Sequence, residues 1–382
     1  MPPSRTAPAW HVLTGEYPPR PGGVGDYTRQ LSRALASAGQ EVHVWAPGEG
    51  GVRDEDGVTV HRAPDLLTPR GLSGLSRGLD ACPGPRRLLL QYVPHALGLR
   101  AMNVPFCAWF AARWHDARWV YIHEAVHPWS PRGPWRHHIL AGTTRMMVRL
   151  VASAANRVFV SIPQWAEHLP ARVRPHAAWL PVPSNLPVNV SSDAVDALRA
   201  ELGEGTWLGH FGTFGRLTAE PLEAALVPLL RGEGTRRALM LGRGSRAFVE
   251  GVETRHPELR GRLVVRDSLT LDDIAVHLAT CDVLLQPYPD GVSTRRTTVM
   301  AGLALGLPVV TNTGHLTEPL WREHGAVALA EGTAPAALVE RAEALLSRAD
   351  TRRELGQHAA RIYREHFALE RTVEALLRAG SR

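Results

Sequence analysis

The chain has 382 residues, 44% of them hydrophobic, which is enough apolar material for two or three domains with buried cores. Its formal net charge is +6, and all 43 basic residues are arginine, because the sequence contains no lysine. Since Gly (35) and Pro (30) are also frequent, this arginine content indicates coding bias as much as function, and no aromatic-interleaved basic cluster or zinc-finger spacing supports a nucleic-acid-binding class.

The charge is unevenly distributed along the chain. The part through Leu186 holds 20 arginines and 12 acidic residues, whereas the remainder holds 23 and 25. A basic N-terminal half is typical of contact with an anionic membrane surface or an anionic acceptor, and a solvated arginine surface without a partner is the alternative.

The cysteines and the apolar segments indicate a cellular compartment. Cys82, Cys107 and Cys281 are odd in number and far apart, without metal-ligand spacing, so we expect a reduced, cytoplasmic protein with no bound metal. The N-terminus lacks the apolar core of a signal peptide, and no run of 18 apolar residues predicts a membrane span.

The first elements predict the opening of a doubly wound α/β sheet. Residues 10–13 form an expected strand, a glycine-rich turn and an apolar-faced helix follow, and a second strand lies near residues 42–46. Gly22, Gly23 and Gly25 lack a Cβ, which allows close approach of a ligand to the backbone. A tight turn without a ligand is the alternative.

Further apolar runs complete this first domain. Strands are expected at 58–60, 86–93, 119–123 and 157–162, helical sequence from Gln164, and a last strand at 178–187 that runs into a proline-rich linker. Residues 139–155 read as a helix whose Arg145 and Arg149 share one face. We interpret it as a core-facing helix, with interfacial membrane contact as the alternative.

A second alternation of strands and helices follows the linker. Strands are expected at 207–211, 238–241, 263–265, 283–286 and 308–311, and helices over 216–231, 271–280, 336–347, 351–366 and 369–379. The resulting division is 1–184 for an N-terminal domain, 185–364 for a C-terminal domain and 365–382 for a terminal helix.

The string YPPRPGGVGDY and the segment Gly39–Val44 resemble the N-terminus of family-4-type glycosyltransferases, and GLPVV (306–310) resembles their donor-site segment. The resemblance implies a GT-B architecture: two Rossmann-like domains facing a cleft, with the C-terminal helix crossing back to the first domain. Two glutamates of the family's donor site are replaced here by Ser293 and Ala301, and Asp290 is a loose substitute for nucleotide binding.

The resemblance also implies a diphosphate site at the loops of the second domain. Arg216 matches a family arginine, whereas Leu222 stands where the family has a lysine. Arginine side chains and helix N-terminal amides are suited to bind phosphate. Of the adjacent Arg295 and Arg296, we expect one to meet phosphate and the other a carboxylate or solvent. The expected diphosphate ligands are Gly22, Gly23, Gly212, Thr213, Arg216, Ser293, Thr294, Arg295, Arg296 and Thr297, with Arg243, Gly244 and Asp290 near the nucleotide.

Side chains at the strand ends of the first domain are the expected sugar and acceptor contacts. His123 and Glu124 follow a strand, where the family carries a histidine that points toward the sugar, so they are the predicted catalytic residues. The predicted acceptor-side residues are Gly25, Asp26, Tyr27, Gln91, Tyr92 and His95.

The predicted function is transfer of a hexosyl group from a nucleotide-diphosphate sugar to a hydroxyl of a glycan, a lipid-linked or a small-molecule acceptor. The resemblance implies retention of configuration and no metal or other cofactor. The alternative is a degenerate, non-catalytic relative that binds nucleotide or glycan, or scaffolds a partner. An epimerase of the same fold and a nicotinamide dehydrogenase fit the residues less well. Peripheral contact at the inner membrane face accompanies the cytoplasmic prediction.

Overall fold

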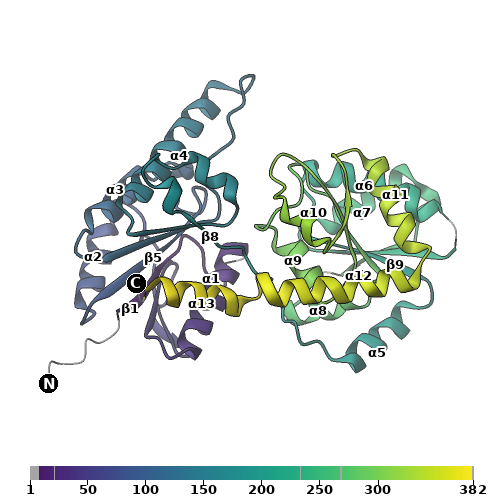
Figure 1. Cartoon of the computed structure of the whole chain (residues 1–382), viewed down its shortest axis with the longest axis horizontal. Helices are drawn as coiled ribbons and strands as arrows, with labels where there is room; N and C mark the ends of the chain where they lie inside the picture. Colours follow the sequence, from purple (N-terminus) through teal and green to yellow (C-terminus); the bar gives the residue numbers. More distant parts are fainter. Residues whose placement is uncertain (1–7, 21, 233, 267–268, 381–382) are drawn as a thin grey trace. The chain divides into compact units, whose positions relative to one another are not determined.

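The computed structural model describes residues 8–20, 22–232, 234–266 and 269–380. The chain forms two compact units (Figure 1). Unit 1 contains the residues up to Pro181 together with those from Thr372 onward, and unit 2 is Val182–Arg371. The boundaries expected from the sequence are 184/185 and 364/365. Because unit 1 takes up the end of the chain, the polypeptide passes from one unit to the other twice.

Among the described residues of unit 1, eight strands form one sheet in the order β3-β4-β2-β1-β5-β6-β7-β8. All neighbours are parallel except β3 and β4, which are antiparallel. The run LLL in the middle of β5 is buried, as expected for a parallel strand covered on both faces. The strands are β1 (Ala9–Leu13), β2 (Val42–Pro47), β3 (Gly51–Glu55), β4 (Val58–Ala63), β5 (Arg86–Tyr92), β6 (Ala117–Ile122), β7 (Arg157–Val160) and β8 (Ala178–Trp179).

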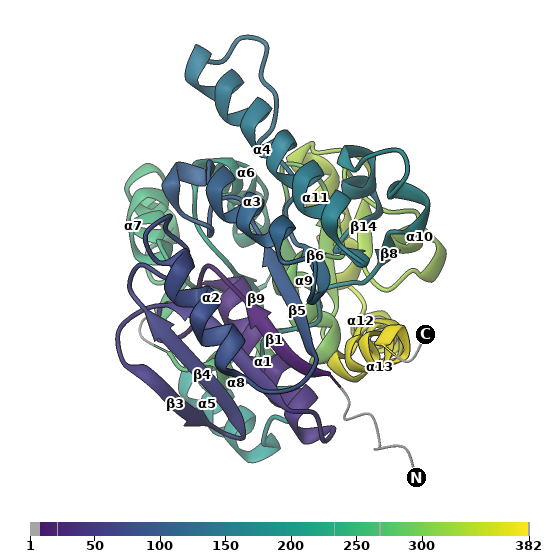
Figure 2. The same ribbon diagram turned by 90° about the vertical axis from the view of Figure 1, so that its left-hand side faces the viewer.

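Helices cover this sheet (Figure 2). They are α1 (Gly23–Ser37), α2 (Leu72–Ala81), α3 (Val104–Ala112), α4 (Trp135–Ala154) and α13 (Leu369–Gly380), with the short turns η1 (Leu99–Ala101), η2 (Pro163–His168) and η3 (Arg174–His176). One expectation was wrong, because the helical sequence from Gln164 forms only a short 3₁₀ helix. The last strand expected to run into the linker within 178–187 is present as β8, which ends at Trp179 before prolines that cannot donate to a ladder.

The described part of unit 2 contains a parallel sheet in the order β11-β10-β9-β12-β13-β14. The strands are β9 (Thr206–Phe211), β10 (Arg236–Leu241), β11 (Leu263–Arg266), β12 (Val283–Gln286), β13 (Val309–Asn312) and β14 (Ala328–Ala330). The helices are α5 (Ser192–Leu202), α6 (Arg216–Arg231), α7 (Ser245–Arg255), α8 (Leu271–Ala279), α9 (Thr297–Ala304), α10 (Leu320–His324), α11 (Pro335–Leu346) and α12 (Ala349–Ile362), with the 3₁₀ turn η4 (Pro257–Leu259) and the π-turn η5 (Tyr363–Phe367). The doubly wound α/β class predicted from the sequence is therefore confirmed in both units.

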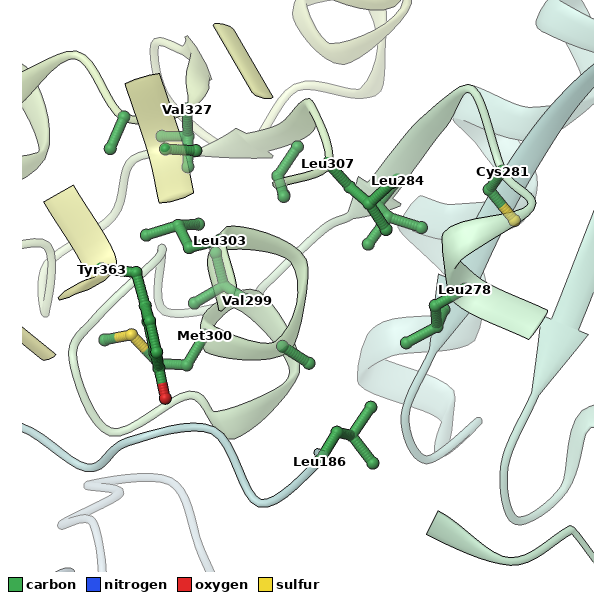
Figure 3. Packing of buried hydrophobic residues seen from close by; sticks show 14 of the residues in the cluster. Leu186, Leu278, Cys281, Leu284, Val299, Met300, Leu303, Leu307, Val327 and Tyr363 are labelled. Carbon is green, nitrogen blue, oxygen red and sulfur yellow. The ribbon is translucent and has the colours of Figure 1, made fainter. Parts of the chain in front are cut away.

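The hydrophobic core of unit 2 fixes helix α9. Val299, Met300 and Leu303 of α9 are buried beside Tyr363 of η5 and Leu186 of the segment that enters the unit (Figure 3). The hydroxyl of Tyr363 also accepts a hydrogen bond from the backbone of Ser184, at 3.1 Å. Since one side of α9 is held by this packing, the loop that leads into its N-terminus has a defined place at the carboxyl edge of the sheet.

Candidate functional site

A carboxylate lies at the glycine-rich N-terminus of α1 in unit 1. Glu16 Oε1 accepts a hydrogen bond from the backbone N–H of Val24 at 3.1 Å, and the N–H of Gly25 also contacts this carboxylate. A Cβ added to Gly22 would collide with the Glu16 carboxylate, whereas one added to Gly23 would meet nothing within 4 Å. Gly22 therefore makes room for a side chain of the protein itself.

The charges around this N-terminus are negative. Burial raises the pKa of Glu16, and the neighbouring charges of Asp26 and Glu124 raise it further. The hydrogen bonds from the Val24 and Gly25 N–H groups lower this pKa but do not outweigh the other effects. Burial likewise raises the pKa of Asp26. An incoming anion would have to displace Glu16 and approach two more carboxylates. Diphosphate binding at Gly22 and Gly23 remains a prediction, and the local electrostatics of unit 1 oppose it.

His123 lies directly after β6 and is 5% exposed. Its Nε2 is 2.6 Å from Gln91 Oε1, so Nε2–H donates and Nδ1 is left without a proton. The His123 carbonyl accepts hydrogen bonds from Ser161 Oγ and Trp165 Nε1, at 3.0 and 2.9 Å, which fixes the backbone. Burial lowers the pKa of His123 to about 3, so the imidazole is neutral at physiological pH.

The predicted acceptor-side residues separate into buried and exposed ones. Tyr27 packs edge-on against the His123 ring, at 5.2 Å between centroids, and Tyr92 donates a hydrogen bond from its hydroxyl to the Thr144 carbonyl at 3.4 Å. Both are core residues, as are Gln91 and Gly25, and the role of these four as acceptor contacts remains a prediction. Of the remainder, His95 is exposed and Asp26 is partly buried.

In unit 2, the three helices that follow β9, β10 and β12 begin without an acidic side chain in the first turn and without a side-chain cap. The N-cap residues are Gly215 for α6, Gly244 for α7 and Arg296 for α9, and none of the three helices has an acid in its first turn. By contrast, α8 has a complete capping box formed by Thr270 and Asp273. Uncapped N-terminal amides and the helix dipole favour an anion.

Arginines are placed at the same three helix starts. Arg216 is the first residue of α6, with its side chain 81% exposed, Arg243 is exposed just before α7, and Arg295 and Arg296 precede α9. These helices follow β9, β10 and β12, which are adjacent in the order β10-β9-β12. Their starts therefore lie side by side at one edge of the sheet. Since cations at helix N-termini oppose folding, this arrangement is better explained by anion binding than by stability.

Two loops of this edge approach each other closely. A Cβ on Gly242 would collide with the Gly212 carbonyl, and Gly242 has φ of +114°. Phe214 N–H donates to the Arg243 carbonyl at 3.1 Å, so the loop after β9 is tied to the loop after β10. Thr213 is exposed beside this contact. The structure thus brings together Gly212, Thr213, Arg216, Arg243 and Gly244, as the sequence predicts.

Asp290 pairs with both arginines that precede α9. Arg295 donates to its Oδ2 and Arg296 to its Oδ1, and Arg296 also stacks on Tyr288, 4.7 Å from the ring centroid. Burial acts to raise the pKa of Asp290, but the charges of Arg296 and Arg295 outweigh it and hold that pKa below its ordinary value.

These pairs correct one expectation. The two arginines do not diverge, because residues 293–296 form a turn before α9 and are not subject to the spacing of a helix. Each carboxylate oxygen of Asp290 accepts from one arginine, so Asp290 orders both guanidiniums, and its contact with a nucleotide remains a prediction.

Glu318, which was not predicted from the sequence, fixes the same loop by hydrogen bonds to Thr294. Its Oε1 accepts from the Thr294 N–H at 2.9 Å and from the Thr294 hydroxyl at 2.5 Å, and its Oε2 accepts from Trp321 Nε1 at 2.9 Å. Glu318 is 1% exposed, and burial raises its pKa. Thr294 therefore holds the loop in place. The neighbouring Ser293 is buried, and its hydroxyl has no partner among the described residues. Thr297 is the first residue of α9.

One group of histidine and cysteine side chains in the described chain brings its donor atoms within 4.8 Å: His11, His43 and Cys82 of unit 1. The rings of His11 and His43 are stacked, with 4.7 Å between centroids and 6° between planes. Because imidazole lone pairs lie in the ring plane, parallel stacked rings do not aim at one ion. Trp45 Nε1 also donates to His11 Nδ1 at 3.1 Å. This geometry does not fit a metal centre.

Two doubly wound units are the architecture of the GT-B glycosyltransferase structures that this chain resembles. Residues 22–185, less than half of the chain, match the family model described as "Glycosyl transferase 4-like domain", and the fold is that of GT-B glycosyltransferases. No curated protein sequence matches the chain.

Solved structures share this fold over nearly the whole chain. Sucrose-phosphate synthase from Thermosynechococcus elongatus superimposes with a TM-score of 0.77 at 17% identity, covering 97% of this chain and 98% of that one. HepE of Anabaena in complex with UDP-glucose gives 0.68 at 15% identity, covering 98% and 99%. An α,α-trehalose-phosphate synthase (UDP-forming) from Burkholderia xenovorans, in complex with glucose-6-phosphate, gives 0.66 at 11% identity, covering 98% and 100%.

Proposed function

We propose that this chain transfers a hexosyl group from a nucleoside-diphosphate sugar to a hydroxyl acceptor, with retention of the anomeric configuration and without a metal ion. The observation that carries the proposal is the set of three uncapped helix N-termini with their arginines, placed by the adjacent strands β10, β9 and β12. Such a site is suited to the diphosphate of a sugar nucleotide.

The arginines supply the chemistry that this reaction needs from the protein. When the bond from the anomeric carbon to the diphosphate oxygen breaks, negative charge develops on the leaving diphosphate. Guanidinium groups and N–H dipoles already in place stabilise that charge without reorganising. Asp290 contributes by holding Arg295 and Arg296 in position before the donor binds.

A neutral His123 is suited to hydrogen-bonding with a sugar or acceptor hydroxyl. Its unprotonated Nδ1 is an acceptor, whereas Nε2 is held by Gln91. With its pKa lowered to about 3, His123 does not act as a cation at neutral pH. We propose that Glu124, the next residue, is also a catalytic residue. The carboxylates around Glu16 agree with contact to hydroxyl groups rather than to phosphate.

The related structures support the nature of the substrates. HepE is seen with UDP-glucose and the Burkholderia synthase with glucose-6-phosphate, which makes a nucleotide-sugar donor and a sugar-type acceptor the first candidates here. Cys82, Cys107 and Cys281 are all free thiols, in agreement with action in a reducing compartment such as the cytoplasm. Among the described residues, no helix has both the length and the apolar character of a membrane span.

The test is calorimetric titration of the purified protein with UDP, GDP, ADP, dTDP and CMP in buffer containing a chelator. We expect saturable binding of one diphosphate, and that diphosphate defines the donor series for transfer assays. If none of the nucleotides binds, the diphosphate site is misassigned and the non-catalytic alternative takes its place.

His123→Ala is expected to reduce turnover about 100-fold or more, within the range found for positioned catalytic groups, while donor affinity changes less than about threefold. The reason is that His123 belongs to unit 1, whereas the proposed donor ligands belong to unit 2. The measurement compares kcat with the dissociation constant of the diphosphate. His176→Ala, at an exposed site of unit 1, is the control. Wild-type turnover in the His123 variant would remove this side chain from the chemistry.

A further inference from the structure

Helix α4 of unit 1 is apolar on two opposite faces. One face is buried on the domain and contains Met147, Val148 and Val151. The other carries large apolar side chains in solvent: Trp135 is 75% exposed, and Ile139 and Met146 are about half exposed. Helices on the surface of a globular domain usually present polar residues on the outer face, so this second apolar face needs an explanation of its own.

The exposed side chains form a continuous stripe. At about 100° per residue, positions 135, 139 and 146 fall within roughly 40° of one another around the helix axis. Gly142, also exposed, lies on the same line. Arg136 and Arg149 are exposed on either side of this stripe. We call Trp135, Ile139, Met146 and the two flanking arginines the α4 outer face.

The surroundings of this face add aromatic and positive character. Trp129, in the segment before α4, is 54% exposed, and its ring lies 5.9 Å from the guanidinium carbon of Arg145. Residues 125–166 contain five arginines and no aspartate or glutamate. Figures 1 and 2 both show that the beginning of α4 and the segment before it extend beyond the rest of unit 1. The face is therefore presented outward, with no acidic residue in its own segment.

We propose that the α4 outer face docks unit 1 onto an anionic lipid bilayer. A helix that lies flat at the membrane interface buries an apolar stripe with aromatic side chains, while arginines along its edges meet the lipid phosphates. Trp129 and Trp135 supply amphipathic rings at headgroup depth, and Arg136 and Arg149 supply the flanking charge. Charge complementarity favours the bilayer as the occupant, because the stripe lies in a stretch of more than 40 residues without an acidic side chain. An apolar stripe that binds another protein would not require such a stretch.

Two kinds of contribution are combined in this mode of binding. The apolar stripe gives binding that resists salt, whereas the arginine contribution is screened as ionic strength rises. We therefore expect attachment to depend on both kinds of side chain and to be reversible, as for a peripheral protein.

The experiment is flotation of the full chain with vesicles of phosphatidylcholine alone or mixed with phosphatidylglycerol. We expect partition into the mixed vesicles and little into the phosphatidylcholine vesicles. Trp135→Ser with Ile139→Ser, and separately Arg136→Glu with Arg149→Glu, are each expected to reduce the partition coefficient at least about tenfold. The matched controls are Trp114→Ser, 79% exposed elsewhere in unit 1, and Arg77→Glu on α2, both expected to bind as the wild type does.

Circular dichroism and thermal unfolding, measured on the same variants, report whether each one is folded and do not depend on the bilayer result. Mixed vesicles that bind the wild type and both double variants equally overturn the proposal. A wild-type dimer in light scattering that the Trp135 and Ile139 substitutions convert to a monomer also overturns it, because the occupant is then a second copy of the chain.

Discussion

The double variant Arg295→Ala with Arg296→Ala is expected to bind the cognate nucleoside diphosphate about 100-fold more weakly than the wild type. A hydrogen bond to a charged group contributes about 1.5–3 kcal/mol, and the proposed site requires each guanidinium to donate at least one to the diphosphate. Either single substitution is expected to weaken binding about tenfold, because both arginines are held by the same carboxylate and both lie at the start of α9.

The matched control for this prediction is Arg255→Ala. Arg255 belongs to the same unit and is paired at the surface with Glu223, at 2.6 Å, away from the start of α9. Its removal is expected to leave the dissociation constant within about twofold, as surface ion pairs contribute little. Titration calorimetry on the wild type and the four variants, with circular dichroism to verify folding, decides the matter. Unchanged affinity in the double variant would place the diphosphate elsewhere.

Glu318→Ala is expected to lower the free energy of unfolding by about 3–5 kcal/mol, the largest effect on stability that the site predicts. Three donors lose their acceptor at once: the Thr294 N–H, the Thr294 hydroxyl and the Trp321 indole N–H, all buried. An unsatisfied buried donor costs about 1–3 kcal/mol. Glu318→Gln, which keeps one acceptor oxygen, is expected to cost less. Chemical denaturation measures both variants.

The pH dependence of this effect has a definite sign. Because burial raises the pKa of Glu318 above its ordinary 4.5, the folded chain binds this proton more tightly than the unfolded chain does. The advantage of the wild type over Glu318→Ala is therefore greatest below pH 4.5 and decreases as the pH rises through the raised value. Glu331→Ala, which removes an exposed carboxylate paired with Arg322, is the control and is expected to cost less than about 1 kcal/mol. An advantage that grows with pH would contradict this account of Glu318.

The sequence predicts the strands of both sheets well where an apolar run is long and flanked by breakers. The core of β5 and the strand β6 before His123 are examples, and the glycine-rich start of α1 is correctly placed as well. Helices without a strong pattern are missed: α3 is apolar nearly all round, and its start depends on the Asn103 side chain, which accepts from Phe106 N–H. Helix α5 has a signal in the sequence, the Ser191 cap, but it is not among the helices expected from the apolar pattern.

The side-chain partners within the candidate site are less predictable. Glu318 and Thr294 are 24 residues apart, and nothing in the spacing relates them before the sheet brings β13 beside β12. Glu16 has a local signal, because an acid stands just before a glycine-rich helix start. This signal is missed when Gly22 is interpreted as part of a ligand site. The contacts of Asp290 depend on the turn before α9. They cannot be predicted from the sequence, because a turn has no periodic spacing of side chains.

Unit 1 is discontinuous in sequence, and this has a consequence for how the chain is made. Val373 and Leu376 of α13 are buried with unit 1, and the end of this helix packs against Arg87 of β5, since a Cβ on Gly380 would meet that guanidinium. During synthesis the first 181 residues leave the ribosome long before these partners exist. The surface of unit 1 that α13 covers therefore stays exposed until the whole of unit 2 has been translated. Completion of unit 1 therefore depends on α13, which is translated after unit 2, and a product truncated before Thr372 leaves unit 1 incomplete.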